Sequence, residues 1–328
     1  MKPKLVFIGA GNITPYHIEA ARETNFRLAG IVGRDYSKSA LDLSEKYSIP
    51  YYEKISHLFD RVKLDCIVLT TPPQETIKFI SKFAEMRIPI LVEKPVSPLS
   101  YLLYDKLHYK NVFVAYNRRF YNTVRELKKV HTQSQGFFHF YVSEVTLNKN
   151  NILESIKQSL YTNTVHMFDL IKYIIGDYKL ANLEYHASNH NMVGYIYKNS
   201  SFIGILVIAF NSKKNTSIEF ENSFLNINIS PLERLQKYNE LQVIEPSIDS
   251  NIRRYIPVWE SNGKAIIEEP SNFKPGFLAQ YEEFYGVISK EIKNINLASL
   301  DDAYDALLKA DMIFSKYSQK IKLSQITI

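Results

Sequence analysis

Near the amino terminus, Gly9 and Gly11 stand between the apolar run KLVFI and the helix-like stretch TPYHIEAAR. Such a turn can hold a phosphate. The first glycine permits a tight turn, the second lets the backbone approach, and the amino end of the helix attracts an anion. Thr14 stands where a third glycine usually allows close packing of helix on strand, a place that a small residue can also take. The turn therefore favours a dinucleotide pyrophosphate site over an ordinary strand–turn–helix, which remains the alternative.

The segment GIVGRDYSKS is expected to end the second strand, where an acidic residue would hold the ribose hydroxyls of NAD. Gly33 takes that place and Arg34 follows it. An arginine here can pair with a 2′-phosphate and stack on adenine, which favours NADP. Asp35 keeps NAD open, and Arg34 as plain surface charge is the remaining alternative.

The first third of the chain alternates apolar, strand-like runs with amphipathic, helix-like stretches. Nearly continuous Val/Ile/Leu runs between helices are typical of a parallel sheet that is covered on both faces. We therefore predict a doubly wound α/β domain over residues 1–119, with its ligand at the carboxyl ends of the strands. The expected strands lie at 4–10, 27–33, 66–72, 89–95 and 112–117.

The pattern changes after Arg119, and strand-like runs come to dominate. Residues 120–328 are predicted to form an α+β domain with a mostly antiparallel, open sheet. Its expected helices include 164–176, which Gly176 should end, and one that begins at Ser299, where SLDD is a capping-box signal. The expected strands lie at 136–147, 181–188, 192–199, 202–210, 216–222 and 223–230.

Six segments, in order along nearly the whole chain, give a more specific indication: GAGNITPYHI, TTPPQET, LVEKPVS, AYNRRF, VHMFDLIKYIIG and SPLERL. Together they resemble the Gfo/Idh/MocA oxidoreductases, the family of glucose-fructose oxidoreductase and inositol dehydrogenase. The resemblance implies bound NADP or NAD, with NADP slightly favoured by Arg34. It also implies a carbohydrate-type substrate, namely a sugar, polyol or nucleotide-linked sugar, and a homodimer or homotetramer formed through the second sheet.

The resemblance also assigns site residues. Lys94 and His166 match the family's catalytic pair beside the nicotinamide, and His17 matches a histidine that often follows the glycine turn. Cofactor binding is expected of Gly9, Gly11, Asn12, Ile13, Arg34, Thr71, Pro72, Glu93 and Lys94, and substrate binding of Arg119, Thr162 and Asp169.

Some positions depart from the family pattern. Thr162 stands where the family usually has an aspartate, four residues before the active-site histidine, and Thr164 stands where it usually has a glycine, two residues before it. Thr76 stands where the family often has a histidine. Without a carboxylate at position 162, the chain lacks one group of the proton relay that the family pattern implies. This absence supports a rival hypothesis, in which the protein is a cofactor-binding but inactive sensor on the same scaffold. A nicotinamide-dependent lyase or glycosidase is a second rival.

The residue types suit alcohol oxidation and its reverse. A histidine with an ordinary pKa near 6.5 can carry the hydroxyl proton at neutral pH. A lysine can polarise a carbonyl and stabilise an alkoxide. Asp169 lies one helical turn beyond His166, where it could orient the imidazole. Tyr161 is a spare proton donor of unassigned position.

Composition narrows the remaining classes. The net charge of +6 comes from scattered Lys and Arg with no run of five or more, so we expect a solvated surface rather than a nucleic-acid site. No apolar stretch reaches the ~20 residues of a membrane helix, and no signal-peptide pattern precedes the first strand. No metal-ligand spacing stands out. We therefore expect a cytoplasmic protein with no metal, nucleic-acid or membrane partner.

Overall fold

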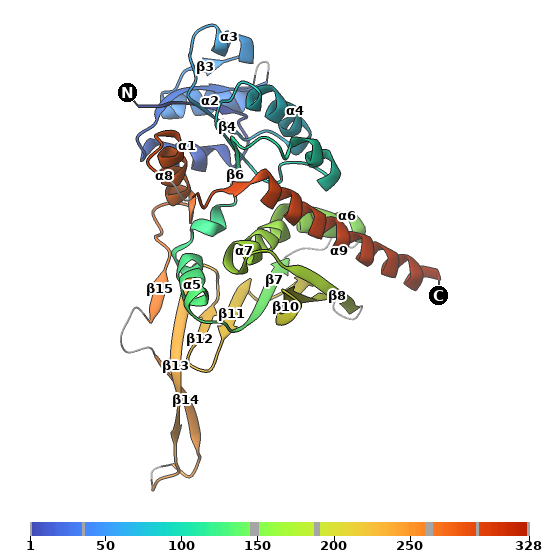
Figure 1. The fold of residues 1–328 in the computed structure, drawn as a ribbon. Coiled ribbons are helices and arrows are strands. Elements are labelled where there is room, and N and C mark those ends of the chain that lie inside the picture. The colour runs from blue at the N-terminus through green and yellow to red at the C-terminus, as the bar shows by residue number, and fades with distance from the viewer. Residues whose placement is uncertain are drawn as a thin grey trace. The chain divides into compact units, whose positions relative to one another are not determined.

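The computed structural model describes residues 2–34, 37–144, 151–186, 191–248, 250–259, 265–292 and 295–326, without the side chains of 320–326. Two compact units divide the chain (Figure 1). Unit 1 comprises Met1–Phe120 and Pro270–Asp311, and unit 2 comprises Tyr121–Glu269 and Met312–Ile328. The chain first passes from unit 1 to unit 2 after Phe120, one residue beyond the domain boundary that the sequence suggests. The segment Pro270–Asp311, which the sequence analysis assigned to the second domain, is grouped with unit 1.

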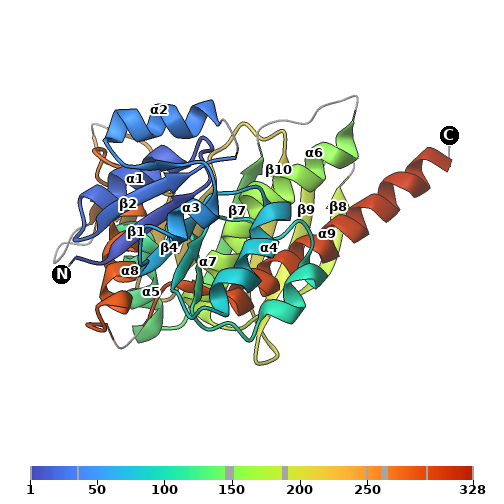
Figure 2. The same ribbon diagram turned by 90° about the horizontal axis from the view of Figure 1, so that it is seen from above.

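Unit 1 is built on a seven-stranded sheet, sheet A, in the order β16-β6-β5-β4-β1-β2-β3. The neighbours among β1 to β6 pair in parallel, and the edge strand β16 pairs antiparallel with β6. Figure 2 shows β1, β2 and β4 side by side. The predicted doubly wound sheet is thus confirmed. The strands are β1 (Lys4–Ile8), β2 (Arg27–Val32), β3 (Tyr51–Tyr52), β4 (Cys66–Leu69), β5 (Ile90–Val92), β6 (Val112–Val114) and β16 (Ala298–Ser299).

The central strands are apolar at every position because both faces of sheet A are covered. Leu5, Phe7 and Val68 belong to a core that includes apolar residues of α1, α2 and α8, while the alternate residues Val6 and Ile67, which are also fully buried, point to the opposite face. The helical segments of unit 1 are α1 (Thr14–Arg22), α2 (Lys38–Tyr47), α3 (Ile55–Phe59), α4 (Pro73–Ala84), η1 (Ser100–Lys106), η2 (Asn117–Phe120), α8 (Phe277–Ile288) and the first part of α9 (Leu300–Ile326).

The late helix α8 explains why Pro270–Asp311 belongs to unit 1. Its Phe284 ring lies 6.0 Å from the ring of Phe26 and 6.2 Å from that of Phe113. Phe277, Tyr281 and Phe284 are all buried in the same core as the strands. Burial of one large apolar side chain stabilises a fold by about 1.5–3 kcal/mol. The three aromatic residues together therefore favour this packing by several kcal/mol of folding free energy.

Unit 2 is built on a nine-stranded sheet, sheet B. All its strand pairs are antiparallel except β7 with β10, so the predicted mostly antiparallel sheet is confirmed. The strands are β7 (Phe137–Glu144), β8 (Lys179–His186), β9 (Asn191–Lys198), β10 (Ser201–Phe210), β11 (Ser217–Glu221), β12 (Asn226–Ile229), β13 (Arg234–Ile244), β14 (Arg254–Trp259) and β15 (Ile266–Glu268).

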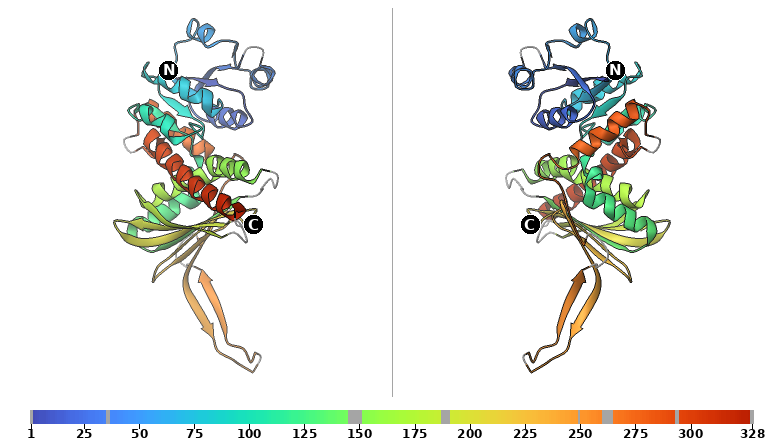
Figure 3. Two further views of the ribbon diagram at one scale, coloured as in Figure 1. Left: turned by 90° about the vertical axis from the view of Figure 1, so that its right-hand side faces the viewer. Right: turned by 90° about the vertical axis from the view of Figure 1, so that its left-hand side faces the viewer.

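One face of sheet B is covered by α5 (Asn122–Gln133) and α7 (Val165–Ile175), and no helix in the described part of unit 2 lies on the other (Figure 3). Burial alternates along β7 accordingly, with Phe138, Phe140 and Val142 fully buried and the residues between them half-buried or exposed. α7 ends at Gly176, whose φ of 85° suits glycine, as the sequence predicts.

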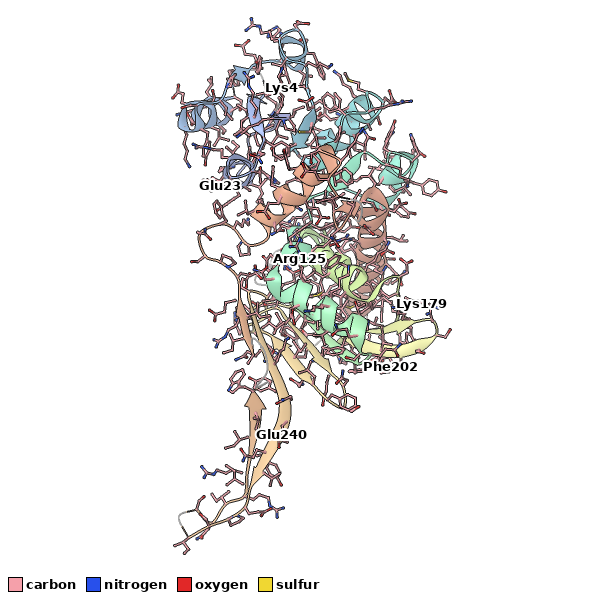
Figure 4. The ribbon with its side chains drawn as sticks, turned by 60° about the vertical axis from the view of Figure 1, so that its left-hand side comes forward. Lys4, Glu23, Arg125, Lys179, Phe202 and Glu240 are labelled. Atoms are coloured by element: carbon pink, nitrogen blue, oxygen red, sulfur yellow. The ribbon has the colours of Figure 1, made fainter. Side chains whose placement is uncertain are left out.

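The hairpin of β13 and β14 extends well beyond the other strands of sheet B (Figures 3 and 4, where Glu240 marks it). Sequence analysis expected no strands here. Its apolar residues Leu241, Val243, Ile252, Tyr255 and Trp259 are all more than 40% exposed. An isolated two-stranded hairpin is marginal in water, so this arm gains little stability from its own chain.

Within the described residues, no helix combines the length and the apolar character that crossing a bilayer requires.

Candidate cofactor and catalytic site

Four neighbouring strands of sheet A end at the same edge, and the predicted cofactor-binding residues follow them. β1 leads into Gly9, β2 into Gly33, β4 into Thr70 and β5 into Glu93. Since β5, β4, β1 and β2 are consecutive parallel neighbours, these residues lie along one edge of the sheet. β1 and β4 flank the point where the strand order reverses, which is where open α/β sheets bind ligands.

The two glycines of the turn meet different demands. Gly9 has φ 111°, its N–H donates to the Val32 carbonyl at 2.9 Å, and a Cβ added to it would lie 2.6 Å from the backbone of Thr70. A Cβ on Gly11 would meet nothing closer than the Thr70 carbonyl oxygen at 3.9 Å, and Gly11 is exposed. Gly9 is therefore required by the fold itself, whereas Gly11 leaves an open approach to the backbone.

Thr14 fits the place of the third glycine by hydrogen bonding. Its Oγ1 lies 2.8 Å from Oγ1 of Thr70, and both side chains are buried. This bond ties the first residue of α1 to the end of β4. In the first turn of α1, the Thr14 N–H donates to the Gly11 carbonyl at 3.0 Å and the Tyr16 N–H to the Ile13 carbonyl at 3.2 Å, while Pro15 has no N–H. The open approach at Gly11 is compatible with the pyrophosphate site that the sequence predicts, and the predicted contributions of Asn12 and Ile13 stay predictions.

At the end of β2, the local packing excludes a side chain at position 33. A Cβ on Gly33 would lie 2.6 Å from Cβ of Ser37 and 2.7 Å from Cβ of Ala40. Ser37 is itself the N-cap of α2 and accepts the Ala40 N–H at 3.3 Å. Arg34 is exposed at this edge, and Asp35 lies outside the described residues.

The loop that follows β4 contains Thr71 and Pro72, and hydrogen bonds to the Thr76 hydroxyl of α4 fix it in place. Thr71 Oγ1 lies 2.7 Å from Oγ1 of Thr76, and the Thr76 hydroxyl also lies 2.9 Å from the Thr71 carbonyl oxygen. Thr76 is almost fully buried, so the residue found in place of the frequent family histidine organises the loop.

Glu93 is the centre of a buried polar network that joins three distant segments. Its Oε1 lies 2.8 Å from Nε2 of His17, whose Nδ1 lies 2.9 Å from the Tyr281 hydroxyl. Its Oε2 accepts the Lys94 backbone N–H at 2.9 Å. Burial raises the pKa of Tyr281 well above its usual value, so its hydroxyl stays protonated. The network fixes the backbone at Lys94, which is half-buried.

Tyr281 was missed by the sequence analysis. It stands 264 residues from His17 in an amphipathic helix, and no local pattern separates it from an ordinary core tyrosine.

The two arginines after β6 have different surroundings. Arg119 is 5% exposed, lies 3.1 Å from an Asp302 carboxylate oxygen and donates to the Asn296 carbonyl at 3.2 Å. This ion pair holds the start of α9, where Ser299 and Asp302 form the predicted capping box. A substrate-binding role for Arg119 would have to compete with these contacts. Arg118 lies close enough to Lys274 to affect its pKa.

His166 lies in unit 2, near the start of α7. The preceding helix α6 (Ile152–Ser159) joins α7 through a π-helical turn, Leu160–Thr164. His166 is 5% exposed and Asp169 1%, whereas Thr162 is exposed and its hydroxyl donates to the Gln158 carbonyl at 2.7 Å. Thr162 thus continues the helix through a backbone contact at the position where the resemblance implies an aspartate.

A buried carboxylate that the sequence analysis did not single out stands at the end of β7. Glu144 is 5% exposed, and its Oε1 accepts hydrogen bonds from the Thr164 hydroxyl at 2.5 Å and from Asn163 Nδ2 at 3.1 Å. Both donors belong to the π-helical turn. Glu144 therefore anchors this turn two residues before His166, and a lone Glu at a strand end gives no such signal in the sequence.

Within the described residues, no group of three His, Cys, Asp or Glu side chains is placed to hold a metal ion.

Comparison with known proteins shows which family this chain resembles. Residues 4–102 match the Gfo/Idh/MocA family, described as an oxidoreductase family with an NAD-binding Rossmann fold, which confirms the resemblance seen in the sequence. The rhizopine catabolism protein MocA of Rhizobium meliloti is 24% identical over 166 residues. That alignment spans 51% of this chain and 47% of MocA, about half the length of this curated relative.

Solved structures share the fold over nearly the whole chain. An oxidoreductase from Agrobacterium radiobacter, in complex with NAD+, L-tartaric acid and magnesium, matches with a TM-score of 0.74 at 14% identity, covering 97% of both chains. The UDP-N-acetylglucosamine 3-dehydrogenase GnnA from Acidithiobacillus ferrooxidans matches with a TM-score of 0.70 at 10% identity, covering 96% of this chain and 97% of that one.

Proposed function

With residues 4–102 belonging to the Gfo/Idh/MocA oxidoreductase family, we propose that this chain is an NAD(P)-dependent oxidoreductase. It transfers a hydride between the nicotinamide and a CH–OH group of a sugar, polyol or nucleotide-linked sugar. The observation that carries the proposal is the shared edge of sheet A. At this edge, the open turn at Gly11 follows β1 and the fixed backbone at Lys94 follows β5, and only β4 lies between these two strands.

The roles of the residues follow from their chemistry. The N–H groups of Asn12 and Ile13, just before α1, bind the pyrophosphate, and Thr71 and Pro72 border the adjacent strand end. Bound cofactor supplies the hydride acceptor or donor. The Lys94 ammonium stabilises negative charge on the substrate oxygen, and His166 takes or gives the hydroxyl proton. Glu93 acts through the backbone, by holding the loop that carries Lys94.

NADP is the preferred cofactor in this proposal. The packing at Gly33 leaves no room for the carboxylate that would hold the ribose hydroxyls of NAD, while the exposed Arg34 next to it can pair with a 2′-phosphate.

Titration with NAD and NADP by calorimetry tests cofactor binding, and a panel of sugars, polyols and nucleotide sugars, followed by absorbance of reduced cofactor, tests turnover. Given a substrate, Lys94→Ala should lower kcat on the order of a hundred- to a thousandfold while leaving cofactor affinity largely intact. His166→Ala should lower it by ~10²–10⁴. Unchanged turnover in both variants would remove the mechanism, and absence of dinucleotide binding would remove the function.

A second candidate is a sensor that binds the cofactor without turning it over. The helical contact of Thr162 favours it, because the hydroxyl that replaces the family carboxylate bonds to the backbone of Gln158. Tight dinucleotide binding with no turnover across the whole panel would support the sensor over the enzyme.

We also propose that the uncovered face of sheet B joins two copies of the chain. Phe202, which Figure 4 labels, is 47% exposed. Its ring contacts those of Phe137, Tyr195 and Tyr197 on this sheet. If two copies of the chain paired through this face, these exposed aromatic rings would be removed from water. Light scattering coupled to size exclusion should show a dimer or tetramer that Phe202→Ser weakens. A monomeric wild type would contradict this arrangement.

A further inference from the structure

One face of the β13–β14 hairpin consists of apolar and aromatic side chains. Residues that pair across two antiparallel strands lie on the same face of the hairpin. Three such pairs follow one another along one face: Tyr238 with Trp259, Leu241 with Pro257, and Val243 with Tyr255. We call these six residues the arm face. The opposite face includes Glu240, Gln242 and Arg254, so the arm face itself is uncharged.

The arm face continues the uncovered face of sheet B. Tyr238 pairs with Asn226 of β12, and Asn226 pairs with Glu221 of β11. Glu221 in turn pairs with Phe137 of β7, so these four residues share one face and one level of the sheet. Phe138, the next residue of β7, is buried on the side that α5 and α7 cover. Phe137 and the arm face therefore belong to the side that no described helix covers.

A second apolar area lies on the same side of sheet B, on β7, β9 and β10. Four aromatic residues form it, joined by ring contacts of 5.3–5.7 Å between centroids: Phe137, Tyr195, Tyr197 and Phe202. We call this area the Phe202 patch. Between it and the arm face, β11 and β12 present polar side chains, namely Glu219, Glu221, Asn226 and Asn228. The uncovered face thus has two apolar areas with a polar strip between them.

The two apolar areas cannot meet within one chain. They lie on the same side of one sheet, and the three steps from β13 to β7 span about 14 Å at ~4.8 Å a step. A second copy can bring them together. A two-fold axis that runs parallel to the strands, over the polar strip, places each arm face on the Phe202 patch of the other copy. Because Tyr238 and Phe137 stand at the same level of the sheet, this rotation brings the base of the arm over the patch.

Association through the edge of the hairpin is less favourable than association through its face. β14 is the last strand of sheet B, and its Pro257 has no N–H to offer to an added strand. A proline at this position interrupts the hydrogen-bond ladder that edge-to-edge pairing needs. A two-stranded hairpin is also marginal in water by itself, so the arm requires a contact along its face.

We propose that the arm of each copy lies across the Phe202 patch of a second copy of the chain. This inference deepens the pairing of uncovered faces proposed above, on which it rests, because it assigns the β13–β14 hairpin as the element that holds the partner. The contact occurs twice in each dimer, as two-fold symmetry requires. It does not depend on the oxidoreductase chemistry.

The only tryptophan of the chain, Trp259, lies on the arm face and reports this contact directly. In the single chain its side chain is 41% exposed. In the wild-type dimer, acrylamide should quench Trp259 weakly. Dilution to monomers should shift its emission to longer wavelength and increase quenching, in step with the fall in mass measured by light scattering.

Leu241→Arg and Gln242→Arg form a matched pair, because the two residues are exposed neighbours on opposite faces of β13. Leu241→Arg should raise the dissociation constant of the dimer on the order of a hundred- to a thousandfold, since a central apolar contact is lost twice. Gln242→Arg should change it within about twofold. A dimeric wild type whose Trp259 stays open to acrylamide would overturn the arm contact and leave the pairing of sheets standing. A monomeric wild type would remove both.

Mixing two variants distinguishes contact between arm and patch from contact between two arms. Leu241→Arg and Phe202→Glu should each be monomeric and keep the circular dichroism of wild type, because both positions are exposed. A mixed dimer of the two retains one unaltered contact and joins Arg to Glu in the other. The mixture should therefore dimerise at concentrations where each variant alone does not. A mixture that stays as dissociated as its components would contradict the proposal.

Discussion

The imidazole of His17, on the first helix, lies 2.8 Å from the carboxylate of Glu93, which directly precedes Lys94. The pair is buried, and the Tyr281 hydroxyl completes it from a helix more than 250 residues further on. The backbone beside the proposed catalytic lysine is therefore held by a buried network of three polar side chains.

Replacing His17 should destabilise unit 1 and loosen the loop at Lys94. His17→Ala leaves the Glu93 carboxylate buried without its ring partner, which should cost about 1–3 kcal/mol of unfolding free energy. Denaturant unfolding measures this. Tyr281→Phe is the control, since it removes one hydroxyl and should cost about 1 kcal/mol. If both variants unfold like wild type, the network has no part in stability.

Gly9→Val and Gly11→Val should separate folding from cofactor binding. Valine at Gly9 meets the Thr70 backbone and a positive φ, so this variant should be severely destabilised or fail to fold. Valine at Gly11 has space, so this variant should keep the stability of wild type and lose dinucleotide affinity. Thermal unfolding and calorimetry give the two readouts. Unchanged NADP binding by Gly11→Val would remove the phosphate-binding assignment of the turn.

Arg34→Ala should weaken NADP binding by about ten- to a hundredfold and NAD binding much less, because a charge-assisted contact to the 2′-phosphate is worth roughly 1.5–3 kcal/mol. Gly33→Asp should not simply convert the preference to NAD, since its Cβ would collide with Ser37 and Ala40. Dissociation constants for both nucleotides decide the matter. A wild type that prefers NAD would contradict this assignment of Arg34.

Glu144→Gln should loosen the π-helical turn that leads to His166. The amide keeps the size of the side chain but loses the charge that strengthens the bonds from Thr164 and Asn163. We expect a loss of about 1–2 kcal/mol in stability. We also expect kcat to fall on the order of ten- to a hundredfold, through displacement of the imidazole. Thr164→Val, which removes one of the two donors, should give a smaller effect in the same direction. Wild-type kcat in Glu144→Gln would separate this carboxylate from the site.

Several features of the fold could be predicted because their causes are local. The apolar runs of sheet A are continuous since both faces are buried, Gly176 ends its helix through a positive φ, and Ser299 and Asp302 cap each other. The glycine turn was predictable for the same reason: Gly9 and Gly11 are neighbours in the sequence and in space.

Other features depend on partners far apart in the chain. The apolar periodicity of α8 predicts a helix but does not say that Phe284 packs against Phe26 and Phe113. β13 and β14 were missed because an exposed hairpin has no buried face to impose alternation on Leu241, Val243 and Tyr255. The cation–π contact between Lys274 and Tyr16 was invisible for the same reason, because the two residues are more than 250 positions apart in the chain.

The return of Pro270–Asp311 to unit 1 also sets an order of events during synthesis. A nascent chain that has reached Phe120 contains β1 to β6 but neither α8 nor β16. Phe26 and Phe113 then lack the aromatic rings that cover them, and β6 presents an unpaired edge. Residues 1–120 therefore complete their core only after the segments of unit 2 that lie between Phe120 and Pro270 have been made, and until then they stay exposed to aggregation and to chaperones.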